Sequence, residues 1–287
     1  MRVVVTGARG LLGAAVAREF AADHEVISLD RHQLDITDER AAASMMALER
    51  PDVVVNCAAY NNVDAAEDDP ALALRVNALG VLTLSRGAAA AGARLVHFSS
   101  DFVFDGETDH PYSEDDRANP RGAYAASKLL GDWFALEAPG SYVLRVESLF
   151  GPPVPGGARR GSLGTIVDRI REEAEVPVFV DRTVSPSYTP DIARAVRSLL
   201  DLQAPPGLYH CVNTGMASWA QIAERAAALI GVPLRMRPLT LETASLRARR
   251  PRYCALSNAK LAAAGVPMQT WEAALAAFLG VTPVERP

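Results

Sequence analysis

Short apolar runs alternate with segments of helical periodicity along the first half of the chain. Five runs have the length of strands and end in small or polar residues: RVVVTG (2–7), EVISLD (25–30), DVVVNCAA (52–59), RLVHFSS (94–100) and SYVLRV (141–146). The Ala- and Leu-rich segments between them repeat apolar residues every three or four positions, at 11–20, 41–50 and 70–92. Buried strands alternating with helices predict an α/β fold, a doubly wound parallel sheet covered by helices on both faces.

The pattern changes after residue 151. PPVPGGARRGS (152–162) is a Pro-, Gly- and Arg-rich loop. Beyond it we expect helices at 163–175, 190–202, 218–230 and 257–279, and a late strand in GLYHCV (207–212). The chain is therefore expected to divide into residues 1–150, with later contributions from about 185–212, and a smaller α/β region over 151–287.

Three glycines three residues apart, Gly7, Gly10 and Gly13, separate the first strand from the first helix. Backbone N–H groups and the helix dipole favour a pyrophosphate at such a turn. Asp30 ends the second strand, where its carboxylate could reach a ribose hydroxyl. The turn thus predicts a dinucleotide site. Asp30 favours NAD, but Arg9 and Arg31 could hold a 2′-phosphate, so the choice between NAD and NADP stays open.

A second group of residues carries acid–base chemistry. Tyr124 and Lys128 are four residues apart on a helix expected to begin just after Pro120, so they share one face. A nearby ammonium would lower the pKa of the phenol and make Tyr124 a usable proton donor. Ser100 ends the fourth strand, at the edge where α/β sheets bind ligands. Tyr-x-x-x-Lys alone is often a surface pair, but the glycine turn upstream favours a catalytic role.

Composition narrows the functional classes. The 287 residues carry a net charge of −5 without a basic block, which argues against nucleic acid or an anionic membrane as partner. Apolar runs stay short of the ~18–20 residues of a membrane span, and residues 1–20 lack a signal-peptide layout. The expected location is cytoplasmic. Neither the three cysteines nor the histidines show metal-ligand spacing: Cys57, Cys211, Cys254, His97, His110 and His210.

Longer motifs resemble one family. NCAAYNNVDAAE (56–67), HFSSDFVFDG (97–106), YAASK (124–128), GLYHCVNTGMASWAQIA (207–223) and RRPRYCALSNAKL (249–261) are similar to the dTDP-4-dehydrorhamnose reductase family of extended short-chain dehydrogenase/reductases. The resemblance spans residues 2 to about 280. It implies a Rossmann-type cofactor domain, a smaller substrate domain, and reduction of a 4-keto-6-deoxy nucleotide-sugar by NADPH or NADH. A homodimer is a further expectation.

The resemblance also implies site residues. The catalytic set is Ser100, Tyr124 and Lys128. The cofactor-binding set, besides Tyr124 and Lys128, is Gly7, Arg9, Gly10, Leu11, Leu12, Asp30, Arg31, Asp35, Ile36, Ala58, Ala59 and Tyr60. The substrate-binding set is Ser100, Asp101, Phe102, Ser148, Arg182 and Arg250. The arginines of RARRPRY (247–253) either clamp a substrate diphosphate or form a solvated basic loop.

Departures from the family motifs cluster around the expected sugar pocket. Phe102 replaces a tyrosine, Ser148 stands where a tryptophan packs on the sugar, and DRTVSPS (181–187) replaces D-Q-x-G-x-P-T. These changes point to an altered sugar rather than rhamnose. Related dehydratases carry Glu and GDP-fucose synthase carries Cys at position 102, so Phe102 disfavours a dehydratase or epimerase. A non-catalytic regulatory subunit of the same fold is the other alternative.

Overall fold

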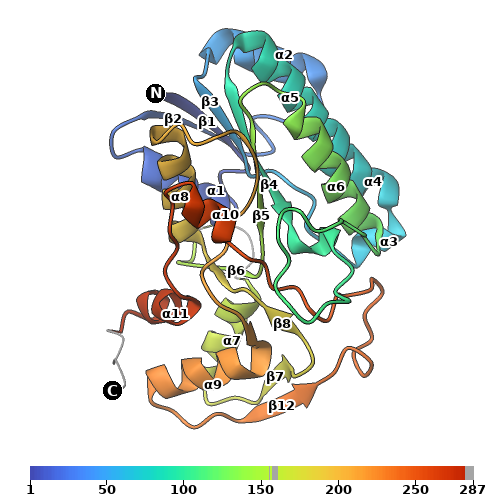
Figure 1. The fold of residues 1–287 in the computed structure, drawn as a ribbon, viewed down its shortest axis with the longest axis vertical. Helices are drawn as coiled ribbons and strands as arrows, with labels where there is room; N and C mark the ends of the chain where they lie inside the picture. The colour runs from blue at the N-terminus through green and yellow to red at the C-terminus, as the bar shows by residue number, and fades with distance from the viewer. Residues whose placement is uncertain (155, 157–160, 282–287) are drawn as a thin grey trace.

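A six-stranded, all-parallel sheet forms the centre of the computed structural model, which describes residues 1–154, 156 and 161–281 (Figure 1). The strand order is β10-β5-β4-β3-β1-β2. The strands are β1 (Arg2–Thr6), β2 (Glu25–Leu29), β3 (Val53–Asn56), β4 (Arg94–Ser100), β5 (Tyr142–Val146) and β10 (Gly207–His210). All five strands predicted in the first half are confirmed, and so is the late strand, which completes the sheet beside β5.

Helices cover both faces of this sheet, as predicted (Figure 1). Val3 and Val5 point to the face packed by α1 (Leu11–Phe20) and α8 (Thr189–Asp201). Val4 points to the opposite face, because side chains alternate along a strand. The helices on that second face are α2 (Glu39–Glu49), α5 (Gly80–Ala91) and α6 (Ala123–Leu136). Burial on both faces explains why these strands read as unbroken apolar runs.

A second core fills the region after β5. Its helices α7 (Ser162–Arg171) and α9 (Trp219–Ile230) bury Ile166 and Ile222. Three short strand pairs frame it: β7 (Val176–Phe179) with β12 (Met236–Leu239), β8 (Thr183–Val184) with β11 (Ala217–Ser218), and β6 (Leu149–Phe150) with β9 (Ser187–Tyr188). Among the described residues, no helix is long and apolar enough to cross a membrane.

Several predicted boundaries were wrong. The helix expected over 163–175 ends at Arg171, and the helix expected just after Pro120 begins at Ala123. The helix expected over 257–279 is broken into α10 (Ala259–Ala263) and α11 (Trp271–Leu279), because Gly265 has a φ of +89° and Pro267 follows it. The short strands of the second region were missed, since two to four residues give little periodicity.

The long helical segment predicted at 70–92 is present but not uniform. It consists of α4 (Pro70–Leu74), a π-helical stretch η1 (Arg75–Leu79) and α5. A four-residue helix, α3 (Ala65–Asp68), precedes it, and a 3₁₀ turn, η2 (Asp101–Val103), follows β4. Single π-helical turns are frequent at functional sites.

Candidate active site

The strand order reverses between β1 and β3, and the glycine turn lies at the carboxyl end of β1. Ligands of open α/β sheets bind in the crevice at such a switch point. Gly7 has a φ of +65°, and a Cβ there would lie 2.7 Å from the Cys57 carbonyl oxygen. A Cβ on Gly13 would lie 2.3 Å from the Gly7 oxygen. Two of the three glycines are therefore required by close backbone contacts.

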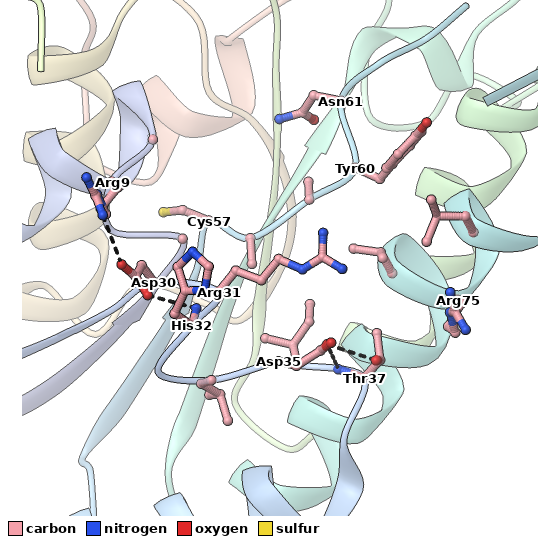
Figure 2. A pocket seen from close by; sticks show the side chains of 18 of the residues that line it. Arg9, Asp30, Arg31, His32, Asp35, Thr37, Cys57, Tyr60, Asn61 and Arg75 are labelled. Carbon is pink, nitrogen blue, oxygen red and sulfur yellow. Dashed lines mark hydrogen bonds and ion pairs between the residues drawn. The ribbon is translucent and has the colours of Figure 1, made fainter. Parts of the chain in front are cut away.

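A cavity of about 720 Å³ opens beside this turn (Figure 2). Ten of the predicted cofactor-binding residues line it: Gly7, Arg9, Gly10, Asp30, Arg31, Asp35, Ile36, Ala58, Ala59 and Tyr60. His32, Thr37, Cys57, Asn61 and Arg75 also line it and were not predicted. Arg75 is brought there by η1, a placement that no local sequence signal marks.

The Asp30 carboxylate is already engaged within this cavity. Its Oδ1 accepts the backbone N–H groups of His32 and Gln33 at 2.8 and 3.2 Å, and its Oδ2 lies 3.4 Å from Arg9 Nη1. These hydrogen bonds lower the pKa of Asp30 against the opposing effect of burial. Figure 2 shows the Arg31 side chain extending into the cavity rather than toward Asp30. Arg9 and Arg31 therefore both place a cationic group in the cavity that Asp30 lines.

A second cavity, of about 900 Å³, adjoins the first and shares Gly10, Cys57, Ala58, Ala59 and Asn61 with it. The predicted catalytic residues Ser100, Tyr124 and Lys128 all line this cavity. So do five further predicted residues: Leu11, Leu12, Asp101, Phe102 and Ser148. The two cavities are therefore continuous across the shared residues, and together they are lined by both Asp30 and Tyr124.

Tyr124 and Lys128 lie one turn apart on α6 with 8 % and 2 % of their surfaces exposed. Lys128 Nζ donates to the Phe98 carbonyl oxygen at 2.6 Å, and burial lowers its pKa to about 8. Burial also raises the pKa of Tyr124; the charge of Asp101 adds to this rise, and hydrogen bonding with Ser100 opposes it. The expected lowering by Lys128 was wrong, because burial dominates the Tyr124 pKa.

The aromatic ring of Phe102 closes one side of the second cavity. It meets the Tyr124 ring edge to face, with centroids 5.6 Å apart. The guanidinium carbons of Arg182 and Arg250 lie 6.0 and 5.7 Å from the Phe102 centroid. Both predicted arginines therefore reach the edge of the site through cation–π contacts with Phe102. Ser148, at a φ of +44°, lies where the backbone turns sharply after β5.

The arginine-rich loop at 247–253 forms ion pairs with acidic side chains and is not simply solvated. Arg250 Nη2 lies 3.0 Å from Asp64 Oδ2, and the Asp64 carboxylate also accepts the Ala248 N–H. Arg247 pairs with Asp68 and Arg249 with Glu107. Arg247, Arg249, Arg250 and Arg252 line a third cavity, of about 460 Å³, together with acidic residues.

Two polar side chains fix the position of α6. Glu67 Oε1 accepts the N–H of Ala123 at 2.8 Å, in place of a side-chain cap that Gly122 cannot supply. Asn77 of η1 bonds both the N–H and the C=O of Tyr60, and its Nδ2 also lies 3.0 Å from Ser127 Oγ. Together they place the start of the helix, and Tyr124 with it, over the cavity.

Sequence reasoning missed two charged groups at the site. Glu147 is 2 % exposed, lines the second cavity and lies beside Asp101. Asp132 forms a buried ion pair with Arg145 at 3.1 Å and favours the charged form of Lys128. Asp132 follows Lys128 by four residues on the same helix, which is a signal the sequence did offer. His210, predicted to be a packed strand residue, is fully buried against Phe104.

The parallel sheet, the glycine turn at its switch point and the Ser, Tyr and Lys side chains in one cavity define a short-chain dehydrogenase/reductase of the extended type. The chain belongs to the RmlD substrate binding domain family, whose model matches residues 1–282.

Relatives of known function are similar over nearly the whole chain. The dTDP-4-dehydrorhamnose reductase of Streptomyces griseus is 39 % identical over 96 % of this chain and 91 % of its own length. The dTDP-4-dehydrorhamnose reductase of Mycolicibacterium smegmatis is 37 % identical over 98 % and 87 %. The crystal structure of the Bacillus anthracis dTDP-4-dehydrorhamnose reductase in complex with NADP superposes with a TM-score of 0.91, at 30 % identity over 97 % and 98 %.

Proposed function

We propose that the protein reduces the keto group of a dTDP-linked 4-keto-6-deoxysugar, with NADPH or NADH as cofactor. The observation that carries this is the convergence of Ser100, Tyr124 and Lys128 in a cavity continuous with the glycine turn. The names of the relatives support the substrate class, and the structure bound to NADP supports the cofactor.

The residues present fit a dinucleotide. Gly7 and Gly10 leave its pyrophosphate access to the N-terminus of α1, and Ala58 and Ala59 leave space beneath its rings. A bound reduced nicotinamide supplies the hydride. The Lys128 ammonium has three N–H donors, and one of them binds the Phe98 carbonyl oxygen. The other two are available for the nicotinamide ribose.

The protein supplies the proton. Ser100 holds the substrate carbonyl oxygen, and Tyr124 donates its phenolic proton to that oxygen as the alcohol forms. The raised pKa of Tyr124 keeps the phenol protonated, as a general acid must be, before the reaction. Among the cofactor and substrate residues proposed above, Phe102, Ser148, Arg182 and Arg250 would face the sugar nucleotide.

We further propose that the six-stranded unit holds the cofactor and that the second core presents the sugar nucleotide. A cytoplasmic location is supported by three cysteines that remain free thiols. A homodimer is supported by the apolar side chains Trp133 and Leu136, which are 58 % and 41 % exposed on α6. Sedimentation velocity of the protein and of a Trp133→Glu variant would test the dimer.

The reaction is tested by mixing the protein with NADPH or NADH and a panel of dTDP-4-keto-6-deoxysugars, and following nicotinamide absorbance. Tyr124→Phe keeps the shape of the site but removes the acid, so kcat should fall by about 10²–10⁴-fold while cofactor affinity barely changes. A wild-type protein that binds both ligands yet never oxidises the nicotinamide would favour the regulatory-subunit alternative.

A further inference from the structure

Two buried carboxylates meet beside Ser100. Asp101 and Glu147 are 3 % and 2 % exposed and follow β4 and β5 directly. These strands pair in parallel with Ser100 opposite Val146, so the next residue of each leaves the sheet at the same place. One ligand atom each of Asp101, Glu147 and Cys254 lies within 4.8 Å of the other two.

The charges around this pair do not balance. Arg182 supplies one cation: its Nη2 donates to Cys254 Sγ at 3.2 Å, and its charge acts on both carboxylates. Glu147 Oε2 accepts the Ser185 N–H at 2.5 Å. Asp101 Oδ2 and Glu147 Oε1 have no hydrogen-bond partner within the described part of the chain. Two ionised carboxylates sharing one guanidinium would leave an uncompensated buried charge, which is costly.

Polar side chains in one cavity lead from the pair to the catalytic phenol. Ser100 Oγ donates to Asp101 Oδ1 at 2.8 Å, and its interaction with the Tyr124 phenol opposes the rise of the Tyr124 pKa. All four side chains line the same cavity. We propose that Asp101 and Glu147 hold one shared proton and pass it through the Ser100 hydroxyl to Tyr124. This inference rests on the proposed reductase function.

The protons balance over one turnover. Tyr124 gives its proton to the substrate oxygen and becomes a phenolate. The Ser100 hydroxyl proton moves to that phenolate, while the proton of the Asp101–Glu147 pair moves to Ser100 Oγ. The pair is left with both carboxylates ionised beside Arg182, and it takes up one proton from solvent after the product leaves. Reduction of one ketone therefore consumes one hydride and one proton.

The surrounding groups decide where the proton lies. Arg182, in the loop before β8, stabilises the negative charge of Asp101. Arg250, in the 247–253 loop, faces Phe102. From α6, Lys128 and Asp132 bring opposite charges. The Cys254 thiol lies within 4.8 Å of both carboxylates and lowers the pKa of Asp101. Burial raises the pKa of Asp101 to about 6, and burial together with the charge of Asp101 raises that of Glu147 well above its usual range. Both shifts favour one proton held between the two carboxylates at neutral pH.

Infrared spectroscopy of the protein tests the shared proton directly. The wild type at pH 7.5 should show the C=O stretch of a protonated carboxylic acid, and Glu147→Gln should remove it. Glu114→Gln is the matched control, because Glu114 also accepts one backbone N–H, that of His210 at 2.6 Å, but lies outside the catalytic cavity. Absence of the band from the wild type, or its survival in Glu147→Gln, would overturn the proposal.

Transient kinetics test the transfer to Tyr124. With NADPH and the dTDP-4-keto-6-deoxysugar that the wild type reduces fastest, Glu147→Gln should complete its first turnover at the wild-type rate, using the proton already on Tyr124. Later turnovers at pH 8 should slow by about 10²-fold, the lower end for assisted proton transfer. Equal slowing of both phases, or slowing of neither, refutes the relay. A wild type that never oxidises NADPH refutes the proposed function and the relay together, whereas the infrared band decides the shared proton independently.

Discussion

Replacing Arg31 with alanine should separate the two nicotinamide cofactors. Figure 2 shows the Arg31 guanidinium in the middle of the cavity, while Arg9 is held beside Asp30. The 2′-phosphate of NADPH is the only group that distinguishes it from NADH. If Arg31 binds this phosphate, Arg31→Ala should weaken NADPH and leave NADH nearly unchanged.

The magnitude follows from the exposure of Arg31. Two unit charges 4 Å apart attract by about 1 kcal/mol in water and by about 4 kcal/mol at an effective dielectric constant of 20. Arg31 is exposed, so the lower end applies, and the second phosphate charge brings the loss to about 1–2 kcal/mol. The Kd of NADPH should therefore rise about 5- to 30-fold.

Fluorescence titration of both cofactors at low and high salt measures this difference. The effect on NADPH should shrink at high salt, because exposed charges are screened. Arg86→Ala, which removes an exposed arginine from α5 outside the cavity, controls for the loss of charge in general. Equal changes in the two Kd values for Arg31→Ala would show that Arg31 is a solvated bystander.

Three further changes test how the site is built. Gly13→Ala places a Cβ 2.3 Å from the Gly7 oxygen and should lower the free energy of unfolding, measured in urea, by about 1–3 kcal/mol. Gly10→Val should fold but lose cofactor affinity. The reverse pattern would contradict this account of the turn. Glu67→Ala removes the acceptor of the Ala123 N–H and should cost about 1 kcal/mol of stability and slow turnover. The control Asp68→Ala loses only an exposed ion pair with Arg247 and should do neither. Because the pKa of Glu147 is raised in the folded state, stability should fall as pH rises above about 4.5, with a slope of up to about 1.4 kcal/mol per pH unit. Glu147→Gln should flatten that slope in urea unfolding at pH 5 to 8, and an unchanged slope would mean that Glu147 is ionised.

The sequence by itself determined the central sheet and many, but not all, of the residues that line the two cavities. Runs such as RVVVT are buried on both faces and can only be central strands, and the glycine turn after them is a local feature of the backbone. Tyr124 and Lys128 were identifiable because a helix brings residues four apart onto one face. These features depend on residues close together in the chain, so they can be recognised without knowledge of the tertiary structure.

Only the tertiary structure decided the electrostatics of the site. The pairing of Ser100 with Val146 brings Asp101 against Glu147 across 46 positions of sequence, and the loop near residue 182 then adds Arg182. Glu67 reaches the start of α6 from a helix 56 residues earlier. Burial, set by the whole fold, reversed the expected shift in the Tyr124 pKa. Such long-range contacts and desolvation leave no periodic trace in the sequence, because they depend on which strand ends and loops the fold places side by side.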